Sequence, residues 1–140
     1  MFVILDTNHY RELLHKTTSG ERLAARIAGG NADVFTTVIT VQEVTQGWVA
    51  EINRRTAGRD QVHAYRQFQS AILDFQEITI LPFDSEAAEV FHSHTAAVRR
   101  IGTMDLKIAS IAVSHEALLL TRNLSHFQQV PRLRVENWLD

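Results

Sequence analysis

The sequence predicts an α/β protein with three layers, in which helices cover both faces of a central, mainly parallel sheet of four to five strands. Two observations lead to this fold class. Short apolar runs, rich in β-branched residues, alternate along the chain with longer stretches in which apolar residues recur every three or four positions. The short runs are apolar at nearly every position, which is typical of strands that are buried on both faces.

The length and composition are those of one globular domain spanning residues 1–140. With 45% hydrophobic and 21% charged residues, a chain of this size can bury a core without disulfide bridges. The chain has no cysteine. This excludes disulfides, thiolate zinc sites and cysteine nucleophiles.

Nothing in the sequence points to a membrane. No apolar run approaches the roughly 20 residues that span a bilayer, so no membrane partner is expected. The first residues lack the basic lead and the long apolar stretch of a signal peptide, and we therefore expect a cytoplasmic protein. The formal net charge of −2 gives no overall attraction to phosphate, although arginines gather locally at Arg54, Arg55 and Arg59.

The first three elements follow from local patterns. The first strand is expected at Phe2–Leu5, an apolar run that ends at Asp6. A helical pattern of apolar residues follows from Tyr10 to Ile27, and Gly29-Gly30-Asn31 is expected to stop it. β-branched residues then predict a second strand over Val34–Ile39.

The next helix is expected to begin near Val41, with Thr40 as its N-cap and Glu43 three residues later, the spacing of a capping box. The remaining elements follow from the same two periodicities. In order they are a helix over Gln61–Phe75, a strand over Ile78–Phe83, a helix from Asp84 through Phe91, a helix from Thr103 through Val113, a strand over Ala117–Thr121, a polar loop over Arg122–His126 and a short strand over Leu133–Trp138.

Three carboxylates stand where predicted strands end or helices begin. Asp6 ends the first strand, Glu43 lies in the first turn of the helix after the second strand, and Asp105 opens the helix before the fourth strand. In an open α/β sheet such positions border one crevice beyond the carboxyl ends of the strands. Carboxylates packed together repel one another unless a cation neutralises them. Oxygen ligands suit Mg²⁺ or Mn²⁺, and such an ion supports phosphodiester hydrolysis.

Each carboxylate also has a simpler interpretation as a helix cap or as a partner of the helix dipole. Asp6 is the hardest of the three to explain in this way, because it directly follows a strand that should be buried. From the residue pattern alone, a metal site and purely structural carboxylates both remain open.

Four segments carry a family resemblance. They are the opening strand that ends in Asp6-Thr7-Asn8, the strand and helix over residues 37–47 with Glu43 and Gly47, the helix start over residues 102–109 with Asp105, and Thr121-Arg122-Asn123 followed by His126-Phe127. In this order and spacing, they resemble the motifs of the PIN-domain ribonucleases, especially the small VapC-like toxins of bacterial toxin–antitoxin pairs. The resemblance covers the whole chain and implies a three-layer PIN-like fold.

The resemblance implies that Asp6, Glu43 and Asp105 are metal ligands and, together with Asn123, the catalytic residues. Relatives place an aspartate where this chain has His126, or an acidic residue where it has Asn123, so the last motif contributes no carboxylate here. Asn123 would offer an amide oxygen or orient a water. His126 would contact phosphate or a softer ion, and the simpler interpretation is that it is only a surface histidine of the loop. Three carboxylates would hold one ion firmly and a second weakly, if at all.

Two further groups of side chains are expected near the site. Hydrogen bonds that orient the carboxylates are predicted for Thr7, Asn8, Thr40 and Thr121. For the threonines, strand propensity or capping is an equally good explanation. Contacts with RNA are predicted for Arg99, Arg100, Arg122 and His126.

The expected function is that of an Mg²⁺- or Mn²⁺-dependent endoribonuclease, the toxin of a toxin–antitoxin pair. The resemblance implies a structured RNA substrate such as tRNA or ribosomal RNA, a cognate antitoxin protein and a homodimer. Trp48, Tyr65 and Phe68 would form a groove for an antitoxin peptide. The same residues would also suit the core, Phe68 above all.

A second function remains open, that of a catalytically weakened PIN-like module that binds RNA or protein. The missing aspartate at His126 favours it. It predicts unchanged binding when Asp105 is replaced by alanine, with no turnover in any divalent metal. A third interpretation, a phosphatase or receiver-type domain, shares the acidic crevice. The Asp6-Thr7-Asn8 start and the lack of a suitably placed lysine pair argue against it.

Overall fold

The structure, a computed structural model, describes residues 1–140 and contains a five-stranded sheet in which every strand pair is parallel. The strands follow the order β3-β2-β1-β4-β5. They are β1 (Phe2–Leu5), β2 (Asp33–Thr37), β3 (Thr79–Leu81), β4 (Leu118–Leu120) and β5 (Arg134–Glu136). The helices are α1 (Thr7–Leu14), α2 (Thr18–Gly30), α3 (Val38–Arg54), α4 (Val62–Asp74), α5 (Ser85–His92), α6 (Ala96–Arg99), α7 (Thr103–Ser114) and α8 (Leu124–Phe127).

Helices cover both faces of this sheet, as the apolar strands predict. In β1, Ile4 belongs to a core cluster with residues of α5 and α7, whereas Val3 and Leu5 belong to a second cluster with residues of α1, α2 and α3. Neighbouring side chains of a strand point to opposite faces of the sheet, so the two clusters are two separate layers of core. The predicted α/β class with a parallel sheet of four to five strands is confirmed.

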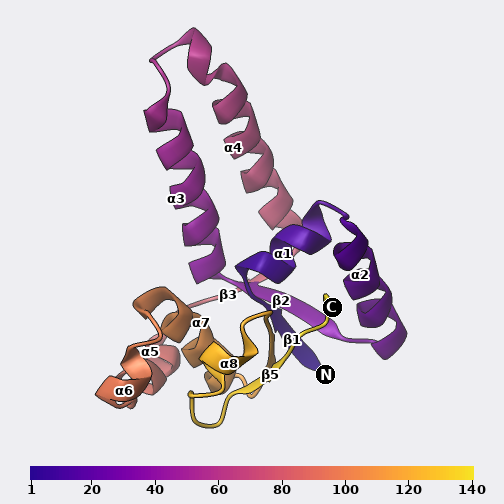
Figure 1. Cartoon of the computed structure of the whole chain (residues 1–140), viewed down its shortest axis with the longest axis vertical. Coiled ribbons are helices and arrows are strands. Elements are labelled where there is room, and N and C mark those ends of the chain that lie inside the picture. Colours follow the sequence, from indigo (N-terminus) through magenta and orange to yellow (C-terminus); the bar gives the residue numbers. More distant parts are fainter.

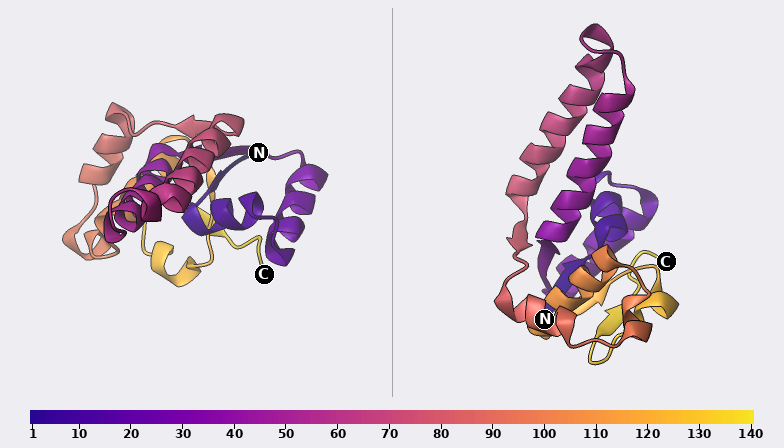
Figure 2. Two further views of the ribbon diagram at one scale, coloured as in Figure 1. Left: turned by 90° about the horizontal axis from the view of Figure 1, so that it is seen from above. Right: turned by 90° about the vertical axis from the view of Figure 1, so that its left-hand side faces the viewer.

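Helices α3 and α4 run side by side and project away from the sheet as a long hairpin (Figure 1). The side view shows that the rest of the molecule lies at the base of this hairpin (Figure 2). Its far end holds the short 3-10 helix Arg59–Gln61 and the arginines Arg54 and Arg55. Those two arginines form ion pairs with Glu51 of the same helix. The arginine cluster seen in the sequence is therefore remote from the sheet.

The single helix predicted over Tyr10–Ile27 is wrong, because the chain turns between α1 and α2. Lys16 has a φ of 51°, in the left-handed region that interrupts a right-handed helix. Thr17 then acts as a new N-cap, and its hydroxyl accepts the main-chain N–H of Gly20 at 3.0 Å. Helix α2 ends at Gly30, and Asn31 caps it in the left-handed conformation, so the stop expected at Gly29-Gly30-Asn31 is confirmed.

The boundary predicted between the second strand and the following helix is also wrong. Strand β2 ends at Thr37, and α3 begins at Val38, three residues before the expected start. The N-cap is Thr37, whose hydroxyl accepts the main-chain N–H of Thr40 at 3.2 Å. The β-branched Val38 and Ile39 imitate a strand in sequence, but this cap commits them to the helix. Glu43 consequently lies in the second turn of α3 rather than in its first.

Two short helices were not predicted from the sequence. Part of the predicted polar loop over Arg122–His126 folds as α8, with Phe127 buried in the core. Residues Ala96–Arg99 form α6, capped by the hydroxyl of Thr95. None of the helices combines the length and the apolar character that crossing a bilayer requires.

Candidate metal centre

Asp6 lies at the carboxyl end of the central strand β1 and is the N-cap of α1. Its Oδ1 accepts the main-chain N–H of His9 at 2.8 Å and lies 3.2 Å from His9 Nδ1. The side chain is only 12% exposed. A carboxylate this deeply placed needs donors for its oxygens, and the turn into α1 supplies them.

Glu43 projects from α3 toward the first residue of α1. The Thr7 hydroxyl donates to Glu43 Oε1 at 3.0 Å. The hydroxyl oxygens of Thr7 and Thr40 are 3.2 Å apart, so the three side chains form a continuous polar cluster. Because Thr7 directly follows Asp6, this cluster ties the helix after β2 to the end of β1.

Asp105 is the third residue of α7, in its first turn. His126 of α8 lies beside it, with Nε2 3.1 Å from Asp105 Oδ2. The Asp105 side chain is 41% exposed, and that of His126 is 26% exposed. The aspartate that relatives carry at the His126 position is thus replaced here by a nitrogen that contacts one of the three carboxylates.

The three carboxylates are near enough for their charges to interact. Burial raises the pKa of Glu43, a hydrogen bond from Thr7 lowers it, and the negative charges of Asp105 and Asp6 raise it further. Burial likewise raises the pKa of Asp105, His126 lowers it, and Asp6 raises it. Both groups therefore hold their protons more tightly than in water. A cation among them would remove the cause of the mutual repulsion.

Each of the three carboxylates has one oxygen held by a protein hydrogen bond and one without such a bond. Oδ1 of Asp6, Oε1 of Glu43 and Oδ2 of Asp105 are the held oxygens. The free oxygens are hard donors of the kind that Mg²⁺ and Mn²⁺ prefer, so the donor set fits such an ion. No three acidic or histidine side chains already converge tightly enough to enclose an ion. A bound cation would have to draw the carboxylates closer together.

The other residues predicted near the site are placed less uniformly. Thr121 is buried, but its hydroxyl accepts the main-chain N–H of Asn123 at 3.0 Å rather than contacting a carboxylate. Asn123 is exposed and precedes α8 without a capping hydrogen bond from its side chain. Asn8 is exposed as well. The structure therefore brings Thr7 and His126 to the carboxylates and Thr40 to Thr7. Asn8, Asn123 and Thr121 form no hydrogen bond with the three carboxylates.

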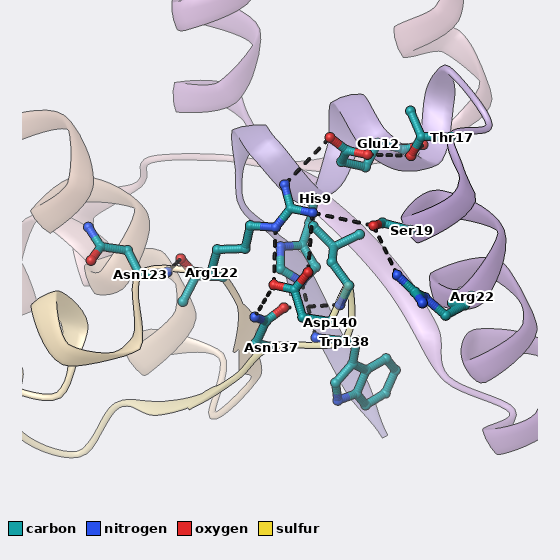
Figure 3. A network of polar contacts seen from close by, with 12 residues as sticks. His9, Glu12, Thr17, Ser19, Arg22, Arg122, Asn123, Asn137, Trp138 and Asp140 are labelled. Carbon is teal, nitrogen blue, oxygen red and sulfur yellow. Dashed lines mark hydrogen bonds and ion pairs between the residues drawn. The ribbon is translucent and has the colours of Figure 1, made fainter.

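Arg122 lies in a network of polar contacts with Glu12, Ser19 and Asp140 (Figure 3). It lies 3.5 Å from Glu12 and 3.3 Å from Asp140, and its guanidinium also contacts Ser19. The hydrogen bonds from Asn137 and Arg122 lower the pKa of Asp140. Arg99 and Arg100 lie at the end of α6 and are exposed. Their contacts with RNA remain predictions.

Two residues that the sequence analysis did not select lie at this site. His9 is fully buried against Asp6, and the positive charge of Arg11 lowers the pKa of Glu43. Both belong to α1, directly after the Asp6-Thr7-Asn8 motif. The available signal was the spacing from Asp6 to His9, because an N-cap side chain commonly accepts the main-chain N–H of the second or third residue after it.

The aromatic residues proposed as one groove line two separate hollows. Trp48 borders a cavity of about 820 Å³ between α1, α3 and α4, together with Tyr10 and Phe75. Tyr65 and Phe68 border a shallower hollow on α4. Phe68 is half-buried and belongs to neither core cluster, so the expectation that it packs in the core is wrong.

A parallel sheet with carboxylates gathered beyond the end of its central strand defines a class of α/β proteins with an acidic crevice. Residues 3–133 match the PIN domain, and the chain belongs to this family. A segment of 38 residues is 47% identical to Ribonuclease VapC2 of Rickettsia felis, and this match spans 27% of this chain and 28% of that protein.

Two solved structures show how far the fold likeness extends. VapBC2 from Rickettsia felis, bound to a DNA fragment from its promoter, superposes with a TM-score of 0.75 at 24% identity over 99% of both chains. VapBC-1 from nontypeable Haemophilus influenzae superposes with a TM-score of 0.76 at 22% identity over the full length of both chains. At these identities the likeness shows the shared fold, and it confirms the PIN-like architecture expected from the four motifs.

Proposed function

We propose that the protein is a metal-dependent endoribonuclease that hydrolyses RNA phosphodiester bonds as the toxin of a toxin–antitoxin pair. The observation that carries this proposal is the set of three carboxylates beyond the sheet, each with one oxygen free of protein hydrogen bonds. Membership in the PIN domain family and the local identity to a ribonuclease support it. The proposed setting is the cytoplasm.

In this proposal Asp6, Glu43 and Asp105 hold Mg²⁺ or Mn²⁺. When bound, the ion polarises a phosphoryl oxygen and lowers the pKa of a bound water. The protein's part is to orient the donors: Thr7 holds Glu43, and His126 holds Asp105. Asn123 is exposed beside α8 and would contact the substrate or a water from there.

The RNA would be held by local positive charge, because the whole chain carries a formal net charge of −2. Arg99 and Arg100 are exposed on the element that precedes the Asp105 helix and suit phosphate contacts. Arg122 already has three partners, so its use by RNA would require it to leave them. A structured RNA of the tRNA or ribosomal class is the substrate that the family resemblance implies.

A cognate antitoxin protein and a homodimer complete the proposal. The cavity between α1, α3 and α4 carries both charged and apolar side chains, among them Arg11, Trp48 and Glu51. Its size and mixed lining suit a peptide segment of a partner protein. Of the three aromatic residues predicted to form an antitoxin groove, only Trp48 lines this cavity.

Divalent metal should both activate and stabilise the protein. Purified protein with RNA is expected to cleave in Mg²⁺ or Mn²⁺ and to stop when EDTA is added. Since the ion would bind the folded state, Mn²⁺ at a hundred times its Kd should add about 2.7 kcal/mol to the free energy of unfolding. Thermal unfolding with and without Mn²⁺ measures the second effect.

The same titration separates an enzyme from a binding module. Cleavage that persists in EDTA would exclude the metal mechanism. RNA binding without turnover in any divalent metal would instead identify the weakened PIN-like module, in which His126 blocks rather than supports the site.

Replacing His126 with alanine should raise the Mn²⁺ concentration needed for half-maximal cleavage by about tenfold. The physical reason is that Asp105 loses the only side chain that holds one of its oxygens. The measurement is cleavage rate against Mn²⁺ concentration. His115→Ala is a matched control, because His115 is exposed and lies at the C-terminal end of α7, the helix that carries Asp105 in its first turn. An unchanged Mn²⁺ requirement in His126→Ala would show that the contact with Asp105 does not support metal binding.

A further inference from the structure

His9 is a fully buried histidine in which both ring nitrogens have partners. Its Nδ1 lies 3.2 Å from Asp6 Oδ1, and its Nε2 accepts the main-chain N–H of Trp138 at 3.3 Å. The two partners are separated by more than 130 positions in sequence. The ring therefore bridges the end of β1 and the segment that follows β5.

The partners determine which ring nitrogen carries the hydrogen. A main-chain N–H can only donate, so Nε2 must be the acceptor of the imidazole. In a neutral imidazole the other nitrogen then carries the hydrogen, and Nδ1–H donates to the Asp6 carboxylate. One buried arrangement satisfies both nitrogens, as expected for polar groups without access to water.

The two donors of residue 9 meet on the same oxygen of Asp6. Oδ1 accepts both the main-chain N–H and the ring, whereas Oδ2 has no protein hydrogen bond. A carboxylate held only by a helix-cap bond can still rotate about its Cβ–Cγ bond. A second donor in a different direction removes that freedom and fixes where Oδ2 points.

The segment Asn137–Asp140, which supplies the Trp138 donor, is anchored on several sides. Leu139 is completely buried in the core, and the Arg26 guanidinium lies 4.4 Å from the centre of the Trp138 ring. Asp140 pairs with Arg122, which also reaches α1 and α2 (Figure 3). These contacts hold the main chain of Trp138 in place, and with it the N–H that donates to His9.

We propose that His9 is a positioning residue for the metal centre. Its Nδ1–H, kept in that tautomer by the main-chain N–H of Trp138, sets the orientation of Asp6 and so the affinity of the site for a divalent ion. This inference rests on the proposed function, because only there does Asp6 bind a metal. It gives the buried polar network between α1 and segment 137–140 a role beyond folding.

Two amide substitutions separate the two contacts of the ring. The side-chain nitrogen of asparagine lies close to where Nδ1 lies, so His9→Asn keeps a donor for Asp6 and gives up the contact with Trp138. The side chain of glutamine reaches the place of Nε2, so His9→Gln keeps an acceptor for Trp138 and gives up the contact with Asp6. Both variants bury a neutral amide in place of a neutral imidazole.

The affinity of the metal-free protein for Mn²⁺ is the readout, measured with Mn²⁺ alone from the electron paramagnetic resonance signal of the free ion. Wild type and His9→Asn are expected to agree within about threefold, and His9→Gln should bind at least tenfold more weakly. Melting temperatures of all three, taken without metal, report the structural effect of each substitution. Equal Mn²⁺ affinities in the two variants would overturn the positioning role, whatever their melting temperatures.

A second measurement needs no variant. Long-range ¹H–¹⁵N correlation spectra of the wild-type protein distinguish histidine tautomers, and His9 is expected to show hydrogen on Nδ1. Hydrogen on Nε2 would overturn the inference. Wild type that fails to bind Mn²⁺ would overturn the metal centre itself, whereas Mn²⁺ binding by wild type with equal affinities in the variants would overturn the role of His9 alone.

Discussion

Asp6→Asn is expected to lower RNA cleavage by about a thousandfold while leaving the fold unchanged. Asparagine has the same shape and is as good an N-cap as aspartate, so α1 keeps the cap bond from the His9 main chain. What is lost is the negative charge that would hold the ion. A metal that stabilises developing charge contributes several kcal/mol to catalysis, and this corresponds to a rate factor of about that size.

The chain offers a closely matched control in Asp84. Asp84 is the N-cap of α5, and its Oδ1 accepts the main-chain N–H of Ala87 at 3.0 Å. Asp84→Asn therefore makes the same chemical change at the same kind of helix start, outside the acidic crevice. Single-turnover cleavage of one RNA by the two variants is the measurement. If Asp6→Asn keeps more than a tenth of the wild-type rate, Asp6 does not hold a catalytic metal.

The position of Asp6 could be predicted from sequence because it depends on local facts alone. A buried apolar run followed by a capping residue places Asp6 at the end of a strand, and strands that alternate with helices place that end beside other helix starts. Asp105 follows from the same logic, and the structure begins α7 at Thr103 as expected. The proximity of these groups was deducible, but their separations were not.

Residue propensity gave the wrong answer where a cap decided the boundary. Val38 and Ile39 favour a strand by residue type, yet the hydroxyl of Thr37 captures the N–H of Thr40 and starts α3 there. The break at Lys16 has a similar cause, since Thr17 caps α2 three residues before Gly20. Both threonines are ordinary in sequence, and only the folded geometry shows which threonine accepts an N–H.

The spacing from Asp6 indicates the first partner of His9, but its bridging role could not have been assigned from sequence, because the second partner comes from the far end of the chain. No local pattern indicates that the N–H of Trp138 would face the ring. The same holds for His126 and Asp105, which lie on separate elements and meet only after α8 packs against the α7 side of the sheet. Long-range pairs of this kind determine which tautomer a histidine adopts and how a carboxylate is oriented. Local sequence motifs indicate which residues form the site but not these details.

Gly20→Ala is expected to destabilise the protein by about 3 kcal/mol, which would lower the melting temperature by about 10 °C. A Cβ built on Gly20 would lie 1.9 Å from the main-chain oxygen of Glu12 and 2.6 Å from its carbonyl carbon. These are backbone atoms of α1 and cannot move aside as a flexible side chain does. Helix α2 would have to shift away from α1, at the cost of the core contacts that Leu23 makes.

The opposite sign is expected for Gly29→Ala in the same helix. A Cβ on Gly29 would meet no atom within 4 Å, so alanine there only restricts the unfolded chain and should add up to about 1 kcal/mol of stability. The free energy of unfolding of the two variants, measured by heat or urea, separates the two effects. Gly20→Ala reports the close approach of α1 and α2, and Gly29→Ala reports intrinsic helix propensity in α2. Two stabilised variants would show that α1 and α2 do not approach closely at Gly20. Loss of stability in Gly20→Ala alone would confirm the close contact between α2 and α1, the helix that Asp6 caps and that carries His9.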